Sequence, residues 1–331
     1  MWNAIAILTV SILAIESTIR LGIQLDLITT PGMGTGNADL NIKIPLLDQY
    51  VKENGGINCI FLGSSMTNDA VIPEVFTRRY RELSSEEITC FNFGVSTLSG
   101  EVAGRLGKII VDRYQPDLLI YGTSARDYSL VLGQKSLLED AWFRYQLGEW
   151  NLAGWLKEYS MIYRYYLGFL ANLNPANRVY AIEVKMNTSS MGYYFVDENK
   201  MDLEGQNIIN EVELNQKDFT GLKRLAALNK SVTRVIVVEV PVHAKFLPVY
   251  VNGSSEDYQS LFFGPVKGIL DNRNIPIIST NTGGRFNVPD DQWADLKHLN
   301  YVGAQKFSSW LAEQIWELED TGSIPRIEWG N

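Results

Sequence analysis

Five short apolar runs recur along the chain, and each is bounded by turn-forming or polar residues. They are the run from Ile57 to Gly63, then Ile88–Phe93, Asp117–Tyr121, Arg234–Val240 and Ile275–Ser279. Short apolar runs between turn signals are typical of buried strands. Stretches with helical spacing separate these runs, so strands and helices alternate. We therefore predict an α/β fold with a mostly parallel five-stranded sheet and helices on both faces.

Helical patterns fill the intervals between these strands. They cover Pro45–Glu53, Pro73–Leu83, a stretch from Ser99 to about Tyr114, Thr220–Asn229, Tyr258–Leu270 and Tyr301–Leu318. Ser99 and Asn300 precede two of these helices, and both residue types are suited to cap a helix N-terminus. Pro45 is expected in the first turn of its helix, and Gly264-Pro265 is expected to break or kink the helix in which it lies.

A long segment from Gln134 to about Leu173 is helical in pattern and unusually rich in aromatic residues. Aromatic residues at helical spacing usually form a packed core, so we interpret the segment as a helical insertion. The alternatives are a lid over a substrate or a surface that faces a membrane. Asn174–Lys217 is polar and is expected to be irregular, with a short strand near Tyr193–Val196. The insertion as a whole is placed at about residues 130–217.

The N-terminal segment from Trp2 to Ile28 is mostly apolar and long enough to span a bilayer as a helix. Glu16 and Arg20 would share one helix face and partly neutralise each other. We expect an uncleaved membrane anchor at residues 1–28. A cleaved signal peptide is disfavoured because no Lys or Arg precedes the apolar run, and an amphipathic helix docked on a soluble protein is the other alternative.

The anchor is followed by a segment with the composition of a flexible linker, Thr29–Asn41. The predicted organisation is therefore an anchor at 1–28, a linker with a short helix at 29–56, and one folded domain at 57–331 that contains the insertion.

Composition narrows the classes of function. The chain has 331 residues and a formal net charge of −9, which argues against a dedicated nucleic-acid binder. It contains two cysteines, Cys59 and Cys90, both in predicted strands, where we expect buried free thiols, with a disulfide as the alternative. Two histidines and no clustered cysteines argue against a metal enzyme, so no metal and no cofactor is expected.

The first predicted strand ends in Gly63-Ser64-Ser65. In an open α/β sheet, ligands bind beyond the carboxyl ends of the strands. The glycine permits a sharp turn, so a serine just after it can project both its hydroxyl and its N–H into a crevice. Ser65 is therefore the candidate nucleophile, although an ordinary loop is the common meaning of such a turn.

The histidines are His243, just after the fourth strand, and His298, in Asp295-Leu296-Lys297-His298 after the last strand. At this spacing within a turn, the carboxylate of Asp295 can orient the imidazole and stabilise its protonated form. His298 is the candidate general base. His243 is expected to be a satisfied loop residue, with substrate binding as the alternative.

Four short motifs in order resemble those of the SGNH hydrolases, also called the GDSL family of esterases and lipases. They are Gly63-Ser64-Ser65-Met66, Asn92-Phe93-Gly94, Gly122-Thr123-Ser124 and Asp295-x-x-His298. The resemblance implies a flavodoxin-like three-layer sandwich and a catalytic triad of Ser65, Asp295 and His298. It also implies that oxyanion donors come from the Ser65 and Gly94 N–H groups and from Ser124, with Asn92 as a further oxyanion or substrate-binding residue.

The chain departs from the family pattern at two positions. Ser64 stands where the family has an aspartate, and Ser124 stands where it has an asparagine. The second change shortens one oxyanion donor, and loss of such a donor typically costs about 3 to 4 kcal/mol. Thr123 or Arg126 would have to compensate.

The resemblance and the anchor together predict a serine esterase or O-acyltransferase that acts on acylated cell-envelope polysaccharide or a similar ester. The expected location is the cell membrane, single-pass, with the catalytic domain periplasmic or extracellular. A multi-span acyltransferase is the expected partner type, by similarity of architecture alone. The alternative is a weakly active or inactive carbohydrate-binding or assembly protein that keeps the fold.

Overall fold

The computed structural model describes residues 2–128, 135–196, 219–230, 232–245, 255–281 and 286–324. The chain forms two compact units. One contains residues 1–48 and 135–186, and the other contains residues 49–134 and 187–331. Helix α2 (Ala38–Asn54) contains the position at which the two units divide. The predicted end of the insertion near residue 217 lies outside the described residues.

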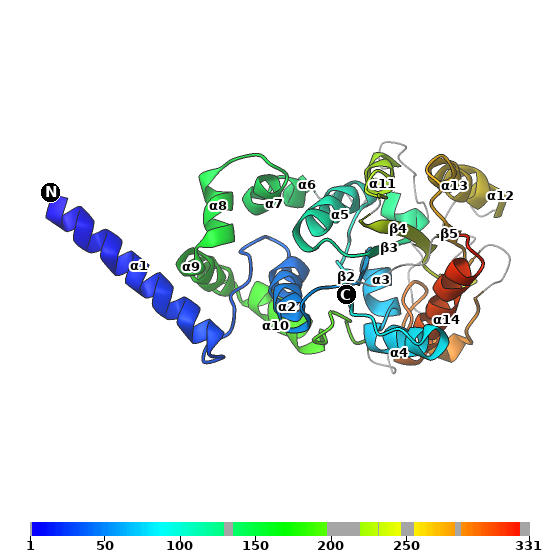
Figure 1. Ribbon diagram of the computed structural model, residues 1–331, viewed down its shortest axis with the longest axis horizontal. Helices are drawn as coiled ribbons and strands as arrows, with labels where there is room; N and C mark the ends of the chain where they lie inside the picture. Colours follow the sequence, from blue (N-terminus) through cyan, green and yellow to red (C-terminus); the bar gives the residue numbers. More distant parts are fainter. Residues whose placement is uncertain are drawn as a thin grey trace. The chain divides into compact units, whose positions relative to one another are not determined.

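The larger unit contains the five predicted strands. They are β1 (Cys59–Gly63), β2 (Cys90–Gly94), β3 (Leu118–Thr123), β4 (Arg234–Glu239) and β5 (Ile277–Ile278). The sheet has the order β2-β1-β3-β4-β5, and every pair is parallel (Figure 1). This is the flavodoxin-like order, in which the direction of winding reverses between β1 and β3. The predicted α/β class and mostly parallel sheet are confirmed.

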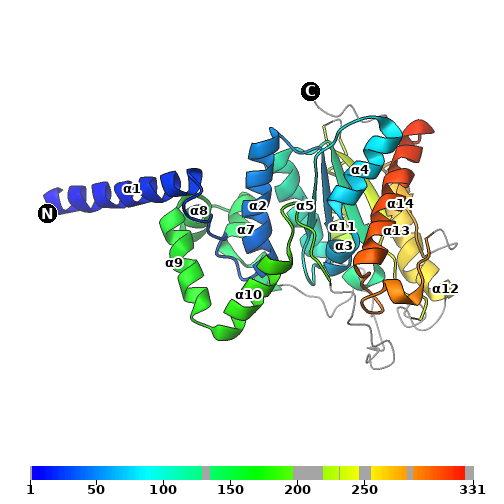
Figure 2. The same cartoon turned by 90° about the horizontal axis from the view of Figure 1, so that it is seen from below.

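Helices cover both faces of this sheet. On one face α4 (Pro73–Ser84) packs on α14 (Tyr301–Asp320), and on the other α11 (Phe219–Ala226) packs on α5 (Gly100–Tyr114) and α13 (Gly264–Asp271) (Figures 1 and 2). All residues of β1, β2 and β3 are buried, which explains why these strands are continuous apolar runs. Cys59 and Cys90 face each other in register and are free thiols.

The predicted helices differ from the observed ones mainly at their ends. Ser99 occupies the N-cap position of α5, but its side chain makes no capping hydrogen bond. The segment predicted as one helix over Tyr258–Leu270 is divided into α12 (Ser255–Tyr258), a π-helical turn at Gln259–Phe263, and α13. This irregular turn lies directly before Gly264-Pro265, where a break was expected.

The smaller unit is helical. It contains α1 (Trp2–Gln24), α6 (Lys135–Leu138), α7 (Ala141–Gln146), α8 (Leu152–Tyr159), α9 (Met161–Asn172) and most of α10 (Pro175–Asn187). Helix α1 is long and apolar enough to cross a membrane by length and composition, with a mean hydropathy of 1.8 and no buried residue. A signal sequence would satisfy the same criteria.

The aromatic segment forms several short helices because polar side chains cap new N-termini within it. The side chains of Asp140, Asn151 and Ser160 accept hydrogen bonds from N–H groups in the first turns of α7, α8 and α9. The prediction of irregular structure after Asn174 was wrong for Pro175–Asn187, which is α10. Near residue 193 the structure has an isolated bridge between Thr188 and Tyr194 in place of a strand.

The segment expected to be a flexible linker is packed against α9. The Arg164 guanidinium donates a hydrogen bond to the Gly32 carbonyl at 3.1 Å, and the Tyr165 hydroxyl donates one to the Thr29 carbonyl. Met33 is fully buried. The following helix α2 begins earlier than predicted, so Pro45 lies inside it and not in its first turn.

Two glycines allow α5 and α11 to pack closely on each other. A Cβ atom at Gly104 would lie 2.4 Å from the Gly221 carbonyl oxygen, and one at Gly221 would lie 1.8 Å from the Gly100 carbonyl oxygen. Backbone atoms cannot yield locally, so any side chain at either position must move a whole helix.

Gly221→Ala is expected to lower the free energy of unfolding by about 1–3 kcal/mol, because the added methyl group must separate α11 from α5. Gly268→Ala in α13 is the matched control, since a Cβ there meets nothing within 4 Å. It should be neutral or stabilising by up to about 1 kcal/mol. Thermal or urea unfolding measures both effects, and equal stabilities of the two variants would contradict the close crossing.

Candidate active site

Ser65, His298 and Asp295 form a continuous hydrogen-bonded chain in the larger unit. Ser65 Oγ lies 3.0 Å from His298 Nε2, and His298 Nδ1 lies 2.7 Å from Asp295 Oδ2. The three residues come from two segments more than 200 residues apart in the sequence, with a separation of 233 residues between Ser65 and His298. A hydroxyl, an imidazole and a carboxylate joined in this order can activate the hydroxyl as a nucleophile.

Ser65 is positioned by the short helix α3 (Ser65–Ala70), which starts where β1 ends. The helix lies directly on the ends of three strands that finish in or near glycine. A Cβ at Gly63 or Gly122 would lie within 2.2 Å of Thr67 Oγ1, and a Cβ at Gly94 would lie 2.5 Å from the backbone of Asn68. The sequence suggested a turn at Gly63, whereas the observed role of all three glycines is to make room for α3.

Asp295 and His298 lie in a tight loop that is held at both ends. Trp293 and Leu299 form an antiparallel bridge across it. Inside the loop, Asp295 Oδ1 accepts hydrogen bonds from the N–H groups of Lys297 and His298, at 2.6 and 2.8 Å. The next residue, Asn300, caps α14 by accepting from the Gly303 N–H, as predicted. The loop therefore presents the carboxylate to the imidazole at the i, i+3 spacing seen in the sequence.

The charges of this loop stabilise a protonated imidazole. Burial alone would raise the pKa of Asp295, but hydrogen bonds from His298 and from the loop N–H groups hold it at about 2. Burial alone would lower the pKa of His298, but the hydrogen bond and charge of Asp295, with the nearby Asp69 carboxylate, raise it above its ordinary value. The site therefore favours proton transfer from Ser65 to His298.

Three groups were predicted as oxyanion donors, and their surroundings differ. The N–H of Ser65 is in the first turn of α3, where N–H groups have no acceptor within the helix. The N–H of Gly94 donates to Asn92 Oδ1 at 2.8 Å. Ser124 is buried, its N–H donates to Asp127 Oδ2 at 2.8 Å, and its hydroxyl has no hydrogen-bond partner among the described residues.

Two other predicted site residues are occupied by structural contacts. The Asn92 side-chain amide is fully buried and donates to the carbonyls of Thr67, Asn68 and Val71, so it fastens α3 to β2. Thr123 Oγ1 lies 2.9 Å from the Tyr128 hydroxyl, and Thr123 is also fully buried.

Arg126 follows β3 in the short 3₁₀ turn Ala125–Tyr128 and is partly exposed. Its charge is close enough to Lys297 to act on that side chain, because burial and then repulsion from Arg126 lower the pKa of Lys297. Arg126 therefore places a positive charge near the loop that carries Asp295 and His298.

His243 is separate from the Ser65–His298–Asp295 chain. Its Nε2 lies 3.1 Å from Asp290 Oδ1, its Nδ1 accepts the Lys245 N–H, and it is buried. Its own N–H donates to the Leu296 carbonyl at 3.0 Å. The geometry matches a satisfied loop residue that supports the loop of His298. Its predicted substrate-binding role stays a prediction.

Asp127 is a site residue that sequence reasoning missed. It is buried beside Ser64 and Ser124, and Oδ1 has no hydrogen-bond partner among the described residues. Burial raises its pKa to about 6, against the lowering effects of the Ser124 N–H, the nearby Ser64 hydroxyl and Arg126. Its sequence context, Thr123-Ser124-Ala125-Arg126-Asp127, is polar and gives no sign of burial, so the sequence offered no signal for this carboxylate.

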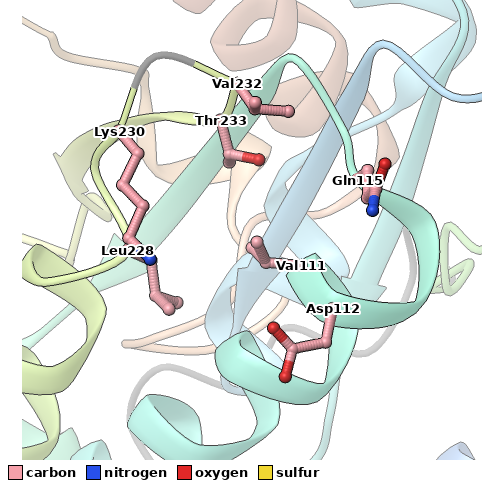
Figure 3. A pocket seen from close by; sticks show the side chains of 7 residues that line it. All are labelled: Val111, Asp112, Gln115, Leu228, Lys230, Val232 and Thr233. Carbon is pink, nitrogen blue, oxygen red and sulfur yellow. The ribbon is translucent and has the colours of Figure 1, made fainter.

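A surface hollow lies elsewhere in the larger unit. It encloses about 360 Å³ and is lined by residues at the end of α5 and before β4, including Gln115, Lys230 and Thr233 (Figure 3). These residues precede β3 and β4, so the hollow lies at the amino ends of the strands, opposite the edge that carries Ser65. We assign it no role in the chemistry of Ser65.

Comparisons with known proteins give a limited result. No protein-family model matches the chain, and no curated protein matches it. Among solved structures, the chain is similar to the crystal structure of the lipase/acylhydrolase from Enterococcus faecalis. The identity is 12%, the match covers 79% of this chain and 96% of that chain, and the TM-score is 0.40. At this identity the activity of that protein does not transfer to the chain.

The imidazole of His298 is expected to titrate above the ordinary histidine value of about 6.5, because ionised Asp295 stabilises its protonated form. Asp295→Asn should lower that pKa. NMR titration of the histidine ring signals measures both, and the chain has only two histidines, so His243→Gln assigns the signals. An unchanged pKa in Asp295→Asn would show that the pair does not interact in solution.

Proposed function

We propose that the protein is a serine esterase or O-acyltransferase that works through an acyl-enzyme on Ser65. The hydrogen-bonded chain from Ser65 through His298 to Asp295 carries this proposal. The Ser65 hydroxyl attacks the carbonyl carbon of an ester while His298 Nε2 takes its proton. Collapse of the tetrahedral intermediate expels the alcohol, which receives that proton. Water or a second hydroxyl, deprotonated by His298, then attacks the acyl carbon, and Ser65 Oγ leaves with the proton that His298 returns to it.

The negative charge of the intermediate needs donors at the carboxyl edge of the sheet. The N–H of Ser65 and the hydroxyl of Ser124 fit this role best, because neither has a described acceptor. The Gly94 N–H would have to leave Asn92 Oδ1 to take part.

We further propose an SGNH-type enzyme of the cell membrane, anchored in a single pass by α1, with its catalytic domain outside the cytoplasm. The four ordered motifs and the apolar length of α1 support this. The substrate class proposed is an acylated cell-envelope carbohydrate or a similar ester, with a multi-span acyltransferase as partner. These finer assignments follow from the family resemblance and from the architecture.

A second candidate is a carbohydrate-binding or assembly protein that has kept the fold but has weak or no activity. The observation that favours it is the state of the oxyanion donors. The N–H groups of both Gly94 and Ser124 are engaged by side chains of the protein itself, and the buried charge of Asp127 lies beside Ser124. A negative charge in this position opposes the formation of an oxyanion.

Labelling with a fluorophosphonate separates the two candidates, since the reagent reacts readily only with an activated serine. We expect a covalent adduct on Ser65, located by peptide mass spectrometry, and none in Ser65→Ala. Ser64→Ala is the matched control, because this neighbouring hydroxyl lies near Asp127. It should keep the adduct. A folded protein that forms no adduct would favour the non-catalytic candidate.

Ester hydrolysis is expected to rise with pH through an apparent pKa above about 6.5, because His298 must be neutral to accept the proton and its pKa is raised. Asp295→Asn should reduce turnover strongly. The corresponding substitution in a serine protease lowers turnover by about 10⁴. Asp127 titrates near the same range, with a pKa of about 6, so Asp127→Asn is the control. If His298 governs the rise in activity, Asp127→Asn should show the rise at the same pH as the unsubstituted protein. Loss of the rise in Asp127→Asn would show that Asp127, and not His298, governs it.

A further inference from the structure

Helices α8 and α9 expose large apolar side chains and turn their charged ones inward, the reverse of the usual pattern for a helix that faces water. In α8, Leu152, Trp155 and Tyr159 are exposed, and in α9, Tyr166, Phe169 and Leu170 are exposed. Each set recurs at spacings of three or four residues, so each forms one face of its helix. Phe169 is 63% exposed, whereas large apolar side chains on a water-facing helix are normally turned inward.

The charged residues of the same helices are turned inward. Lys157 is 8% exposed, and its Nζ donates to Asp140 Oδ2 at 2.7 Å. Glu158 accepts hydrogen bonds from Trp142 Nε1 and from the Gln146 side chain, each at 2.8 Å. Arg164 is the one charged residue of α9. It is 4% exposed and donates to the Gly32 carbonyl in the segment that follows α1. The exposed faces of α8 and α9 therefore carry no charge.

Helix α1 is fastened to the junction between α8 and α9 by its only two charged residues. Glu16 accepts hydrogen bonds from the N–H groups of Met161 and Ile162, at 2.9 and 3.1 Å, and so occupies the N-terminus of α9. Arg20 donates to Glu16 and to the Tyr159 carbonyl at the end of α8. Figure 2 shows the end of α1 beside α8 and α9.

The length of α1 sets the depth of this junction. From Trp2 to Glu16 the helix rises about 21 Å at 1.5 Å per residue, which is less than the hydrocarbon thickness of about 30 Å. If α1 crosses the bilayer, the α8–α9 junction therefore lies close to the boundary of the apolar layer. Side chains near the junction then need to be apolar where they face the surroundings, and polar groups within the unit need hydrogen-bond partners. Both are observed in α8 and α9.

We propose that the exposed faces of α8 and α9 lie in the interfacial region of the bilayer that α1 spans, and that they form a second membrane-contact surface. The Trp, Tyr, Phe and Leu side chains of these faces are the types that settle at a membrane interface. Continuity with α1 favours lipid over a protein partner or a second copy. This inference rests on the proposed membrane anchor and is independent of the chemistry of Ser65.

The test uses the full-length chain in phosphatidylcholine vesicles, with an environment-sensitive fluorophore on one introduced cysteine. The positions are Trp155→Cys and Phe169→Cys on the proposed surface, Ile7→Cys in α1, and Glu87→Cys, a highly exposed charged position, as the water control. The native cysteines are buried, and the unsubstituted chain serves as the labelling blank. Lipid-borne nitroxides quench probes in the bilayer, and iodide quenches probes in water.

At positions 155 and 169 we expect quenching by nitroxide lipids and loss of most of the iodide quenching seen at position 87. Quenching at position 7 alone, with 155 and 169 behaving like 87, would overturn the surface and leave the anchor. Absence of nitroxide quenching at position 7 would overturn the anchor and the surface together. Protection from iodide at 155 and 169 without nitroxide quenching would show that protein, not lipid, covers this face, and would also overturn the proposal.

Discussion

The close seating of α3 on the ends of β1, β2 and β3 is the constraint on which the site depends. Side chains at Gly63, Gly94 or Gly122 would collide with Thr67 or with the backbone of α3. Asn92 then fixes the helix from the β2 side through three backbone carbonyls. These contacts hold α3 in place, so they fix the position of Ser65 independently of the Asp295–His298 loop.

The second half of the site is built separately from the first. The loop of Asp295 and His298 is closed by the Trp293–Leu299 bridge and continued by the Asn300 cap of α14. Helix α14 is in turn joined to the chain after α3, since the Ile72 N–H donates to the Ser308 hydroxyl at 2.8 Å. Helix α14 therefore connects the Asp295–His298 loop to the segment that follows α3.

The sequence predicted what depends on local pattern. The five strands, the positions of most helices and the Asp295–His298 turn follow from apolar runs, capping residues and short spacings, and the pairing of Ser65 with His298 followed from the order of four motifs. Contacts made across long separations were not visible. The carboxylate of Asp127 and the packing of Met33 depend on tertiary burial. Helix α10 was missed because the segment from Asn174 to Lys217 was judged polar as a whole, whereas α10 itself carries apolar residues such as Val179, Ile182 and Met186.

The ion pair between His298 and Asp295 also links the stability of the fold to acidity. The raised pKa of His298 means that the pair contributes stability below the unfolded histidine value of about 6.5 and loses it as pH rises through the folded value. The pKa of Asp295, about 2, means that its contribution is present above about 3.9 and is lost only as the medium approaches pH 2. The pair therefore stabilises the fold most in mildly acidic solution. The proposed chemistry requires a neutral imidazole. That form predominates only above the folded pKa of His298, where the contribution of the protonated imidazole to stability has been lost.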